Sequence, residues 1–297
     1  MSEAVPWTIR RLLEWTAPFF TRKEVDSPRL SAELLLAHVL QVPRIKLYTD
    51  YDRVLSEKEL IQFRELVKRA GEQEPIAYLT GTAHFFNLEF AVTPDVLIPR
   101  PETETLVEHI LQLARHETGL SSPRILDLCT GSGCIAAALA QNLKTAVVIA
   151  TDISEKALAV AKQNLQKLQL DQRVTLAQGD LFSALDNLPD ARNFDLIVSN
   201  PPYIPAADIE KLDKSVRDFE PRLALDGGLD GLSSHRRILS EAPKYLAPGG
   251  RIYLEIAYDQ GPAVLEIARQ YPEFESPKIL KDLGPRDRIL TAQLRKL

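Results

Sequence analysis

From residue 124 onward, short apolar runs alternate with helix-like segments, and this alternation constrains the fold more than any other feature of the sequence. The apolar runs predict strands over Ile125 to Leu128, Ala146 to Ala150, Val174 to Ala177, Phe194 to Val198 and Arg251 to Ile256. Helices are predicted over Cys134 to Gln141, Arg236 to Leu246 and Ala263 to Gln270, and Ser154 is predicted to cap a further helix that runs to Leu168. Such alternation is typical of a parallel sheet with helices on both faces. Two final runs, Lys278 to Leu280 and Arg288 to Thr291, predict a closing antiparallel pair, so we expect a mostly parallel α/β fold.

The first 75 or so residues have the pattern of helices without strands. Ser27 followed by Pro28 predicts an N-cap and a first helical position for a helix that runs to Leu40. Ser56 and Glu59 predict a capping box at the start of another helix. Aromatic and β-branched residues around Asn87 then predict a short hairpin over residues 84–92, and a helix is expected from Glu104 to His116.

Composition and charge exclude several classes of protein. The chain has 297 residues, a net charge of −5 and no apolar run of the roughly 18 residues that span a membrane. The first residues lack the pattern of a signal peptide, so we expect a cytoplasmic protein with no membrane partner. The acidic balance argues against direct nucleic-acid binding. Cys129 and Cys134 have no His or Cys neighbours with metal-ligand spacing, so no metal is expected.

The stretch Asn200-Pro201-Pro202-Tyr203 follows the predicted strand at Phe194 to Val198. Prolines cannot donate to a sheet ladder, so the chain must leave the sheet here, at the carboxyl edge where open α/β folds bind ligands. The side-chain carbonyl of Asn200 and the backbone carbonyl of Pro201 suit a planar –NH2 group, which has two hydrogens to donate. Tyr203 offers a flat face for a planar substrate group. Because a neutral asparagine is no base, these residues predict a site that holds an amide or amino nitrogen.

A Gly-rich loop and three aspartates predict a cofactor site at the same edge. Gly131, Gly133 and Ala136 match G-x-G-x-x-A, which also permits a dinucleotide and a dehydrogenase. Asp127, immediately before the loop, is awkward beside a pyrophosphate but suits a cationic ligand, and S-adenosylmethionine carries an ammonium and a sulfonium. Asp152 could bind ribose hydroxyls, and Asp180 could accept a hydrogen bond from an adenine amino group. All three aspartates lie at the carboxyl ends of predicted strands, which favours a methyltransferase over a dehydrogenase.

Together these residues resemble the class I S-adenosylmethionine-dependent methyltransferases, and most closely the glutamine methyltransferases of peptide chain release factors (the HemK/PrmC family). The resemblance covers nearly the whole chain. Its segments start at Ser27, Ala32, Glu74, Leu97, Asn200, Phe219 and Gly284. The most specific are Ile98-Pro99-Arg100-Pro101 and Glu220-Pro221-Arg222-Leu223-Ala224-Leu225.

The resemblance implies a role for each motif. The loop Cys129-Thr130-Gly131-Ser132-Gly133, after Asp127, would cradle the methionine part of S-adenosylmethionine, Asp152 would hold its ribose, and Asp180 with Leu181 would border its adenine. Asn200, Pro201, Pro202 and Tyr203 would hold the substrate glutamine, and we add Arg100 to the substrate-binding residues. The substrate would be the glutamine of the Gly-Gly-Gln motif of release factors.

The resemblance also divides the chain and leaves alternatives. Residues 1–80 would form a helical domain that docks the substrate, residues 81–101 a hairpin linker, and residues 102–297 the Rossmann-like methyltransferase domain. Many family members have glycine at the position of Cys129, whereas relatives that methylate a ribosomal protein glutamine often share the Cys-Thr-Gly-Ser-Gly loop. A ribosomal protein substrate is therefore one alternative, and an adenine-N6 nucleic acid methyltransferase and a non-catalytic adaptor are others. His84, His109 and His235 are expected in surface or hairpin roles, because the chemistry needs no dedicated base.

Overall fold

The computed structural model describes residues 6–116, 120, 122–188 and 190–296, and the chain forms two compact units. One unit comprises Met1–Thr82 and Asp213–Phe219, and the other comprises Ala83–Leu212 and Glu220–Leu297. We call them the helical unit and the sheet unit. In the described part of the chain, no helix combines the length and the hydrophobicity that a membrane span requires.

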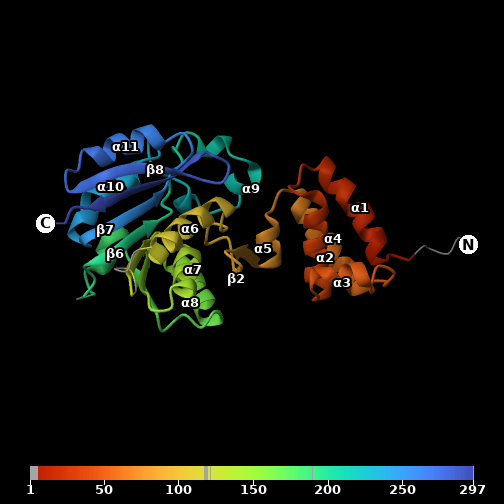
Figure 1. Ribbon diagram of the computed structural model, residues 1–297. Coiled ribbons are helices and arrows are strands. Elements are labelled where there is room, and N and C mark those ends of the chain that lie inside the picture. Colours follow the sequence, from red (N-terminus) through yellow and green to blue (C-terminus); the bar gives the residue numbers. More distant parts are fainter. Residues whose placement is uncertain (1–5, 117–119, 121, 189, 297) are drawn as a thin grey trace, which may run out of the picture. The chain divides into compact units, whose positions relative to one another are not determined.

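Helices packed around one apolar core make up the helical unit (Figure 1). They are α1 (Ile9–Arg22), α2 (Pro28–Leu40), α3 (Arg44–Thr49), α4 (Glu57–Gly71) and α5 (Ile76–Thr80). The short α9 (Lys214–Arg217) is assigned to the same unit, but none of its residues is buried. The capping box of Ser56 and Glu59 is confirmed at the start of α4. Helix α2 begins at Pro28 and ends at Leu40, as predicted, with Ser27 at the N-cap position. The capping hydrogen bond expected of Ser27 is absent, and its backbone is left-handed (φ 45°).

A two-stranded hairpin begins where the helical unit ends. Strands β1 (Thr82–Phe85) and β2 (Leu88–Ala91) pair with each other, as predicted. Phe86 and Asn87 connect them with φ values of 49° and 61°. Two successive left-handed residues give the turn that matches the twist of paired strands, and asparagine tolerates this conformation better than most residues.

The sheet unit contains a seven-stranded sheet in the order β5-β4-β3-β6-β7-β9-β8. Its strands are β3 (Arg124–Leu128), β4 (Val147–Asp152), β5 (Val174–Gln178), β6 (Phe194–Ser199), β7 (Leu246–Glu255), β8 (Phe274–Lys281) and β9 (Asp287–Leu294). The strands from β5 to β7 are parallel, while β9 pairs antiparallel with β7 and β8. The predicted α/β class and the closing antiparallel pair are thus confirmed. Because the strand order reverses between β3 and β6, a crevice is expected at their carboxyl ends.

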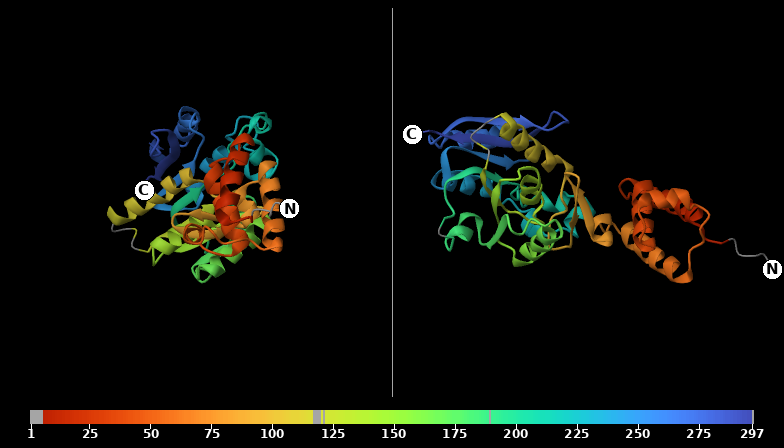
Figure 2. Two further views of the ribbon diagram at one scale, coloured as in Figure 1. Left: turned by 90° about the vertical axis from the view of Figure 1, so that its right-hand side faces the viewer. Right: turned by 60° about the horizontal axis from the view of Figure 1, so that its bottom comes forward.

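Helices cover both faces of this sheet (Figures 1 and 2). One apolar core joins α6 (Pro101–His116), α7 (Cys134–Asn142) and α8 (Glu155–Lys167) to one face. A second core joins α10 (Ser233–Glu241) and α11 (Gly261–Arg269) to the other. Short 3-10 helices follow strands or helices at Leu181–Leu185, Ile209–Lys211, Arg222–Ala224 and Ala242–Lys244.

Two predicted helices have wrong boundaries. The helix expected over Arg236 to Leu246 starts earlier, at Ser233, and it ends at Glu241, because Pro243 has no N–H for the carbonyl four residues earlier. Pro248, Gly249 and Gly250, expected to stop that helix, instead lie within β7, where the pairing register with β6 shifts. The helix expected from Glu104 starts earlier, at Pro101, which suits the first position of a helix.

Asn164, a fully buried residue of α8, ties the hairpin to the loop after β3. Its Oδ1 accepts a hydrogen bond from the Ala91 N–H (2.7 Å), and its Nδ2 donates to the carbonyls of Ala91 (3.0 Å) and Ser132 (2.9 Å). These bonds satisfy backbone groups of two segments at once, so Asn164 fixes the loop relative to the hairpin.

We predict that Asn164→Ala lowers the free energy of unfolding by about 1–3 kcal/mol, because buried backbone groups lose their partner. Urea denaturation of the two proteins measures the difference. Asn142→Ala is the matched control, since the Asn142 side chain bonds only one turn back, to Ala138 of its own helix. A loss no larger for Asn164→Ala than for the control would contradict this role.

Candidate active site

A cavity of about 310 Å³ opens at the carboxyl ends of β3, β4, β5 and β6, where the strand order reverses. Ten of the predicted site residues line it: Arg100, Cys129, Thr130, Gly131, Ser132, Asp152, Asp180, Leu181, Asn200 and Pro202. Four other predicted residues, Asp127, Gly133, Pro201 and Tyr203, are not among the lining residues that the structure describes. The sheet therefore gathers most of the predicted cofactor and substrate residues around one space.

The loop after β3 has an unusual backbone. Cys129, Gly131 and Gly133 have φ values of 58°, 55° and 80°. A Cβ on Gly133 would lie 3.2 Å from the Ala161 side chain, so glycine allows α8 to pack closely. Left-handed φ is uncommon for a residue with a side chain, which explains why glycine would suit the position of Cys129. Burial raises the pKa of the Cys129 thiol to about 12, so the thiol stays neutral.

Asp127 lies beneath this loop and is fully buried. Its Oδ2 accepts hydrogen bonds from the Thr130 hydroxyl (2.6 Å) and the Ala136 N–H (3.2 Å), so it joins the loop to the first turn of α7. Its Oδ1 is buried without a hydrogen-bond partner. Burial raises the pKa of this carboxyl to about 7. A cation close to Oδ1 would favour the ionised form.

The other two strand-end aspartates have different partners. Asp152 accepts hydrogen bonds from the backbone N–H groups of Gly131 (2.9 Å) and Ser154 (2.9 Å), one on each oxygen. Burial raises the pKa of Asp152 despite these bonds. Asp180 forms a bidentate ion pair with Arg237 of α10: Nη1 donates to Oδ1 at 3.0 Å and Nη2 donates to Oδ2 at 2.9 Å. Sequence reasoning missed Arg237, which lies 57 residues beyond Asp180 in no recognisable motif.

Asn200 follows β6, and the orientation of its carboxamide is defined by Thr103 in the first turn of α6. The Asn200 Nδ2 donates to Thr103 Oγ1 at 3.1 Å. The nitrogen end of the amide is therefore engaged, and the carbonyl oxygen Oδ1 is the end that can accept a hydrogen bond from a ligand. Thr103 also lines the cavity, although no sequence motif assigned it a role.

Arg100 connects the two most specific sequence segments. Its guanidinium pairs with Glu220, whose other oxygen accepts a hydrogen bond from the Ile98 N–H (3.2 Å). Glu220 is buried, so this pair joins the Ile-Pro-Arg-Pro and Glu-Pro-Arg-Leu segments across 120 residues of sequence. Arg100 thus has a structural partner besides its place in the cavity lining.

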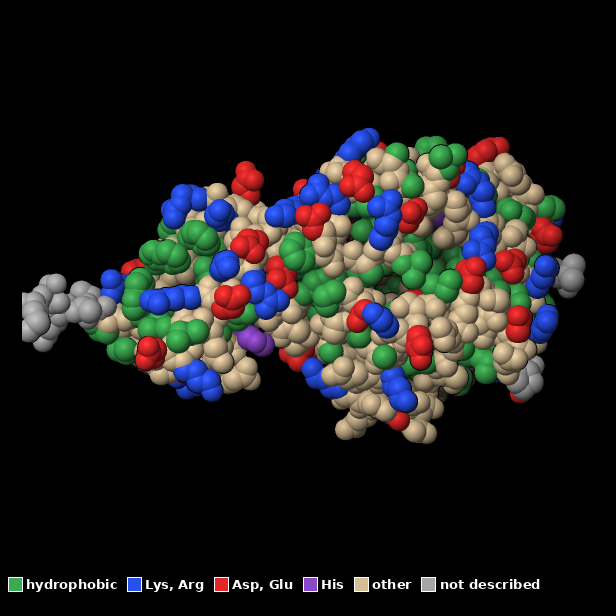
Figure 3. Space-filling view, turned by 180° about the vertical axis from the view of Figure 1, so that it is seen from behind, with side chains coloured by type: hydrophobic (Ala, Val, Ile, Leu, Met, Phe, Trp, Pro, Cys, Tyr) green, Lys and Arg blue, Asp and Glu red, His purple; other side chains and the backbone are tan. Residues whose placement is uncertain are grey.

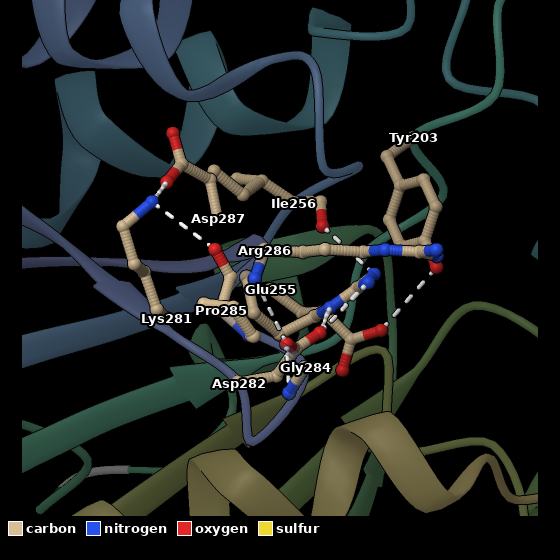
Figure 4. A network of polar contacts seen from close by, with 10 residues as sticks. Tyr203, Glu255, Ile256, Lys281, Asp282, Gly284, Pro285, Arg286 and Asp287 are labelled. Carbon is tan, nitrogen blue, oxygen red and sulfur yellow. Dashed lines mark hydrogen bonds and ion pairs between the residues drawn. The ribbon is translucent and has the colours of Figure 1, made fainter.

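A polar cluster lies behind the Asn200–Tyr203 turn (Figure 4). The Tyr203 hydroxyl donates to Glu255 Oε1 at 3.3 Å, and the side chain of Gln260 donates to the Tyr203 carbonyl at 2.9 Å. Glu255 is 1% exposed. Arg288, from the Gly-Pro-Arg-Asp-Arg segment, binds Asp282 (3.2 Å) and favours the ionised form of Glu255. The Tyr203 hydroxyl is therefore turned toward this cluster.

One expectation for the histidines is wrong. His235 is fully buried in α10, and its Nε2 lies 2.7 Å from the Glu255 backbone oxygen. It is on the apolar face of α10 that packs against the sheet, so it has no surface role. Burial lowers the pKa of His235 to about 4, so it is neutral at physiological pH. His84 is exposed in the hairpin, as expected.

Comparisons with known proteins agree with this architecture. Residues 11–81 match the family described as PrmC N-terminal domain, and residues 121–278 match a methyltransferase domain family. A protein of Rhodopirellula baltica named release factor glutamine methyltransferase is 44% identical over 98% of both chains. One of Geobacter sulfurreducens with the same name is 46% identical over 87% of both.

A solved structure also shares the fold. The 16S rRNA N2 G1207 methyltransferase of Thermus thermophilus, in complex with AdoMet and guanosine, has a TM-score of 0.51. It is 19% identical, and the match covers 72% of this chain and 50% of that one. The solved structure confirms the predicted class I methyltransferase fold. The family match and the relatives confirm the predicted resemblance to release factor glutamine methyltransferases.

Proposed function

The chain belongs to the release factor glutamine methyltransferase family, and we propose that it methylates the Gly-Gly-Gln glutamine amide of release factors, using S-adenosylmethionine. The observation that carries this proposal is the Asn200 carboxamide at the cavity, whose nitrogen is engaged by Thr103 and whose oxygen can accept from an amide N–H. Near full-length similarity to relatives of that name supports the choice of substrate.

The charges of the cavity support S-adenosylmethionine as the methyl donor. Among the described lining residues, four carboxylates outnumber two guanidinium groups: Asp95, Asp152, Asp180 and Asp226 against Arg100 and Arg237. Both guanidinium groups are already paired with carboxylates. Asp95, Asp180 and Asp226 are paired with Lys156, Arg237 and Arg222, so among the described lining residues Asp152 is the carboxylate without a cationic partner. This donor set suits a cationic sulfonium ligand better than the pyrophosphate of a dinucleotide. The unpartnered, buried Oδ1 of Asp127 is a further group that a nearby cation would stabilise.

We assign the cofactor contacts from this geometry. Each Asp152 oxygen holds one backbone N–H, which fixes the carboxylate and leaves lone pairs for two ribose hydroxyls. The Cys129–Gly133 loop would lie against the methionine part, and Asp180 with Leu181 would border the adenine. When bound, S-adenosylmethionine supplies the methyl group and the leaving group.

The work of the protein is then alignment and electrostatics. An amide nitrogen is a poor nucleophile, because its lone pair is delocalised into the carbonyl. Asn200 Oδ1 and the Pro201 carbonyl would accept both N–H hydrogens and so hold the nitrogen in line for transfer. These carbonyl dipoles also stabilise the positive charge that develops on the nitrogen. The methylated nitrogen is acidic and loses its proton to water, which fits a cavity that no described histidine lines.

A transfer experiment tests the function. The protein is incubated with methyl-labelled S-adenosylmethionine and, separately, with a release factor, a ribosomal protein or a nucleic acid. We expect label on the release factor, and none when its Gly-Gly-Gln glutamine is replaced by glutamate.

Asn200→Ala should lower turnover by about 10²-fold or more while leaving cofactor binding nearly unchanged. Label on the ribosomal protein or nucleic acid alone would contradict the proposed substrate, and near wild-type turnover in Asn200→Ala would contradict the amide clamp.

Asp152 gives a test of the cofactor site. Charge-assisted hydrogen bonds contribute roughly 1.5–3 kcal/mol, so Asp152→Ala should weaken S-adenosylmethionine binding about 10- to 100-fold. Calorimetry measures the dissociation constant, with Asp171→Ala, at an exposed turn, as the matched control. An unchanged constant would remove Asp152 from the site, and binding of a nicotinamide dinucleotide would favour a dehydrogenase.

We also propose that the helical unit docks the body of the protein substrate. A groove of about 540 Å³ lies between α1 and α4, with Trp7, Leu12, Trp15, Phe19, Phe63 and Val67 among its lining residues. Lys23, Arg64 and Lys68 line it as well, against one acidic residue, Glu72. Figure 3 shows hydrophobic side chains gathered on the surface of this unit with Lys and Arg around them. These features suit an apolar segment of the substrate that carries acidic residues.

Trp15 is the residue that tests this docking surface. It is 51% exposed and stacks on Phe19, with ring centroids 5.4 Å apart. Exposed aromatic anchors dominate binding at interfaces, so Trp15→Ala should raise KM for the intact release factor about 10-fold and leave kcat unchanged. A short Gly-Gly-Gln peptide should be methylated equally well by both proteins. Ile45→Ala, at an exposed site outside this groove, is the control, and equal KM values for all three proteins would contradict docking at the groove.

A further inference from the structure

The Asn200 carboxamide has two ends of similar shape and opposite chemistry. Its oxygen accepts hydrogen bonds and its nitrogen donates them, so only the partners around it decide which end faces the substrate. A substrate amide presents N–H groups, and it can be held by Asn200 Oδ1 but not by Asn200 Nδ2. The clamp proposed above therefore works only while something holds the Nδ2 end away from the substrate.

Thr103 is in contact with the Nδ2 end. It is 2% exposed, and its hydroxyl lies 3.1 Å from Asn200 Nδ2. A hydroxyl can donate one hydrogen bond and accept others, so Thr103 can bind either end of the amide. Which end it binds depends on where its own hydrogen points.

Glu255 lies next to Thr103 and supplies the deciding charge. The nearby Thr103 hydroxyl and the hydrogen bond from Tyr203 lower the pKa of the Glu255 carboxyl, and Glu255 Oε2 is buried without a hydrogen-bond partner of its own. Arg288 of β9 lowers this pKa too, while Glu102 of α6 raises it. Burial is the largest influence and raises the pKa to about 7.

Two more titratable groups lie near residue 255: the Cys134 thiol, and His235, whose Nε2 contacts the Glu255 backbone oxygen rather than its carboxyl. Cys134 of α7 has a thiol pKa raised to about 12, and His235 of α10 has a pKa lowered to about 4. Both are therefore neutral near pH 7, so Glu255 is the group of this cluster that titrates there.

We propose that the ionised Glu255 carboxylate orients the Asn200 carboxamide through the Thr103 hydroxyl and so acts as a positioning residue for methyl transfer. An ionised carboxylate can only accept, so the Thr103 hydrogen points to Glu255 and the Thr103 lone pairs face Asn200 Nδ2. Protonated Glu255 can donate to Thr103, whose hydrogen then binds Asn200 Oδ1. In that state the Asn200 carboxamide flips, so that Nδ2 instead of Oδ1 faces the substrate. The inference rests on the proposed function.

The pH dependence of turnover tests it. For the wild type, kcat with the release factor should fall about tenfold per pH unit below a midpoint near pH 7, the pKa of Glu255. Glu255→Gln cannot ionise, so its profile should be flat between pH 6 and 8.5. Glu266→Gln, at an exposed site on α11, should keep the wild-type profile.

Thr103 variants separate orientation from mere packing. At pH 8.5, Thr103→Val should lower kcat at least 10-fold with unchanged binding of S-adenosylmethionine, and Thr103→Ser, which keeps the hydroxyl, should restore it. A wild-type midpoint that persists in Glu255→Gln, or full turnover in Thr103→Val, would overturn the proposal. A wild type that labels no release factor at any pH would instead contradict the proposed function.

Two measurements need no substrate. In protein with 15N-labelled asparagine, the side-chain amide signals of Asn200 should shift with a midpoint near pH 7, and Glu255→Gln should abolish that shift. Asn200 side-chain amide signals that do not respond to pH would overturn the proposal. This outcome does not depend on which protein is the substrate.

Thermal stability reports the same titration. The pKa of Glu255 is raised from 4.5 to about 7, so between these values the unfolded chain has lost a proton that the folded protein keeps. Stability therefore falls as the pH rises through this window and is constant above it. The Tm of Glu255→Gln relative to wild type should rise from pH 5 to 7 and then level off. A constant difference would contradict the raised pKa.

Discussion

The turn at Asn200–Tyr203 cannot be held in place by its own backbone, because two of its four residues are prolines without an N–H. Hydrogen bonds from distant segments hold it instead. Asn200 donates to Thr103 of α6, Gln260 donates to the Tyr203 carbonyl, and the Ile204 N–H donates to the Leu225 carbonyl (3.0 Å). The position of the amide clamp thus depends on segments from across the sheet unit.

This dependence gives a physical account of the sequence segments that carry no chemistry of their own. Arg100 and Glu220 join two loops that both line the cavity. Arg288 lies behind the turn, where its charge favours the ionised form of the buried Glu255. We interpret the segments that contain Arg100, Glu220 and Arg288 as the surroundings that fix the position of the Asn200 side chain. The motif Asn-Pro-Pro-Tyr alone is therefore less specific for a substrate than the motif together with these segments.

The fold and much of the site follow from the sequence, because they depend on local patterns. Strand and helix alternation predicts the sheet, and the strand-end positions of Asp152 and Asn200 predict where they meet. Asn87 predicts its turn, since its conformation is set by its neighbours in sequence. Ser27 shows the limit of such rules: a favourable N-cap residue is in a left-handed conformation and does not cap.

Residues whose partners are distant in sequence could not be predicted. Arg237 pairs with Asp180, and Asn164 bonds to Ala91 and Ser132, because the fold brings together segments that are far apart in sequence. The burial of His235 and Glu255 likewise depends on packing between elements, which a single sequence does not encode as a motif. The pKa shifts of Asp127 and Glu255 follow from that packing, because burial is their largest cause.

In the mechanism that we propose, the Asn200 oxygen faces and holds the substrate amide. A crystal structure of the protein with S-adenosylhomocysteine and a release factor carrying unmethylated Gly-Gly-Gln tests it most directly. We expect the glutamine nitrogen to lie within hydrogen-bonding distance of both Asn200 Oδ1 and the Pro201 carbonyl, with Asn200 Nδ2 still bonded to Thr103. A glutamine amide bound elsewhere in the cavity, or an Asn200 side chain released from Thr103, would contradict it.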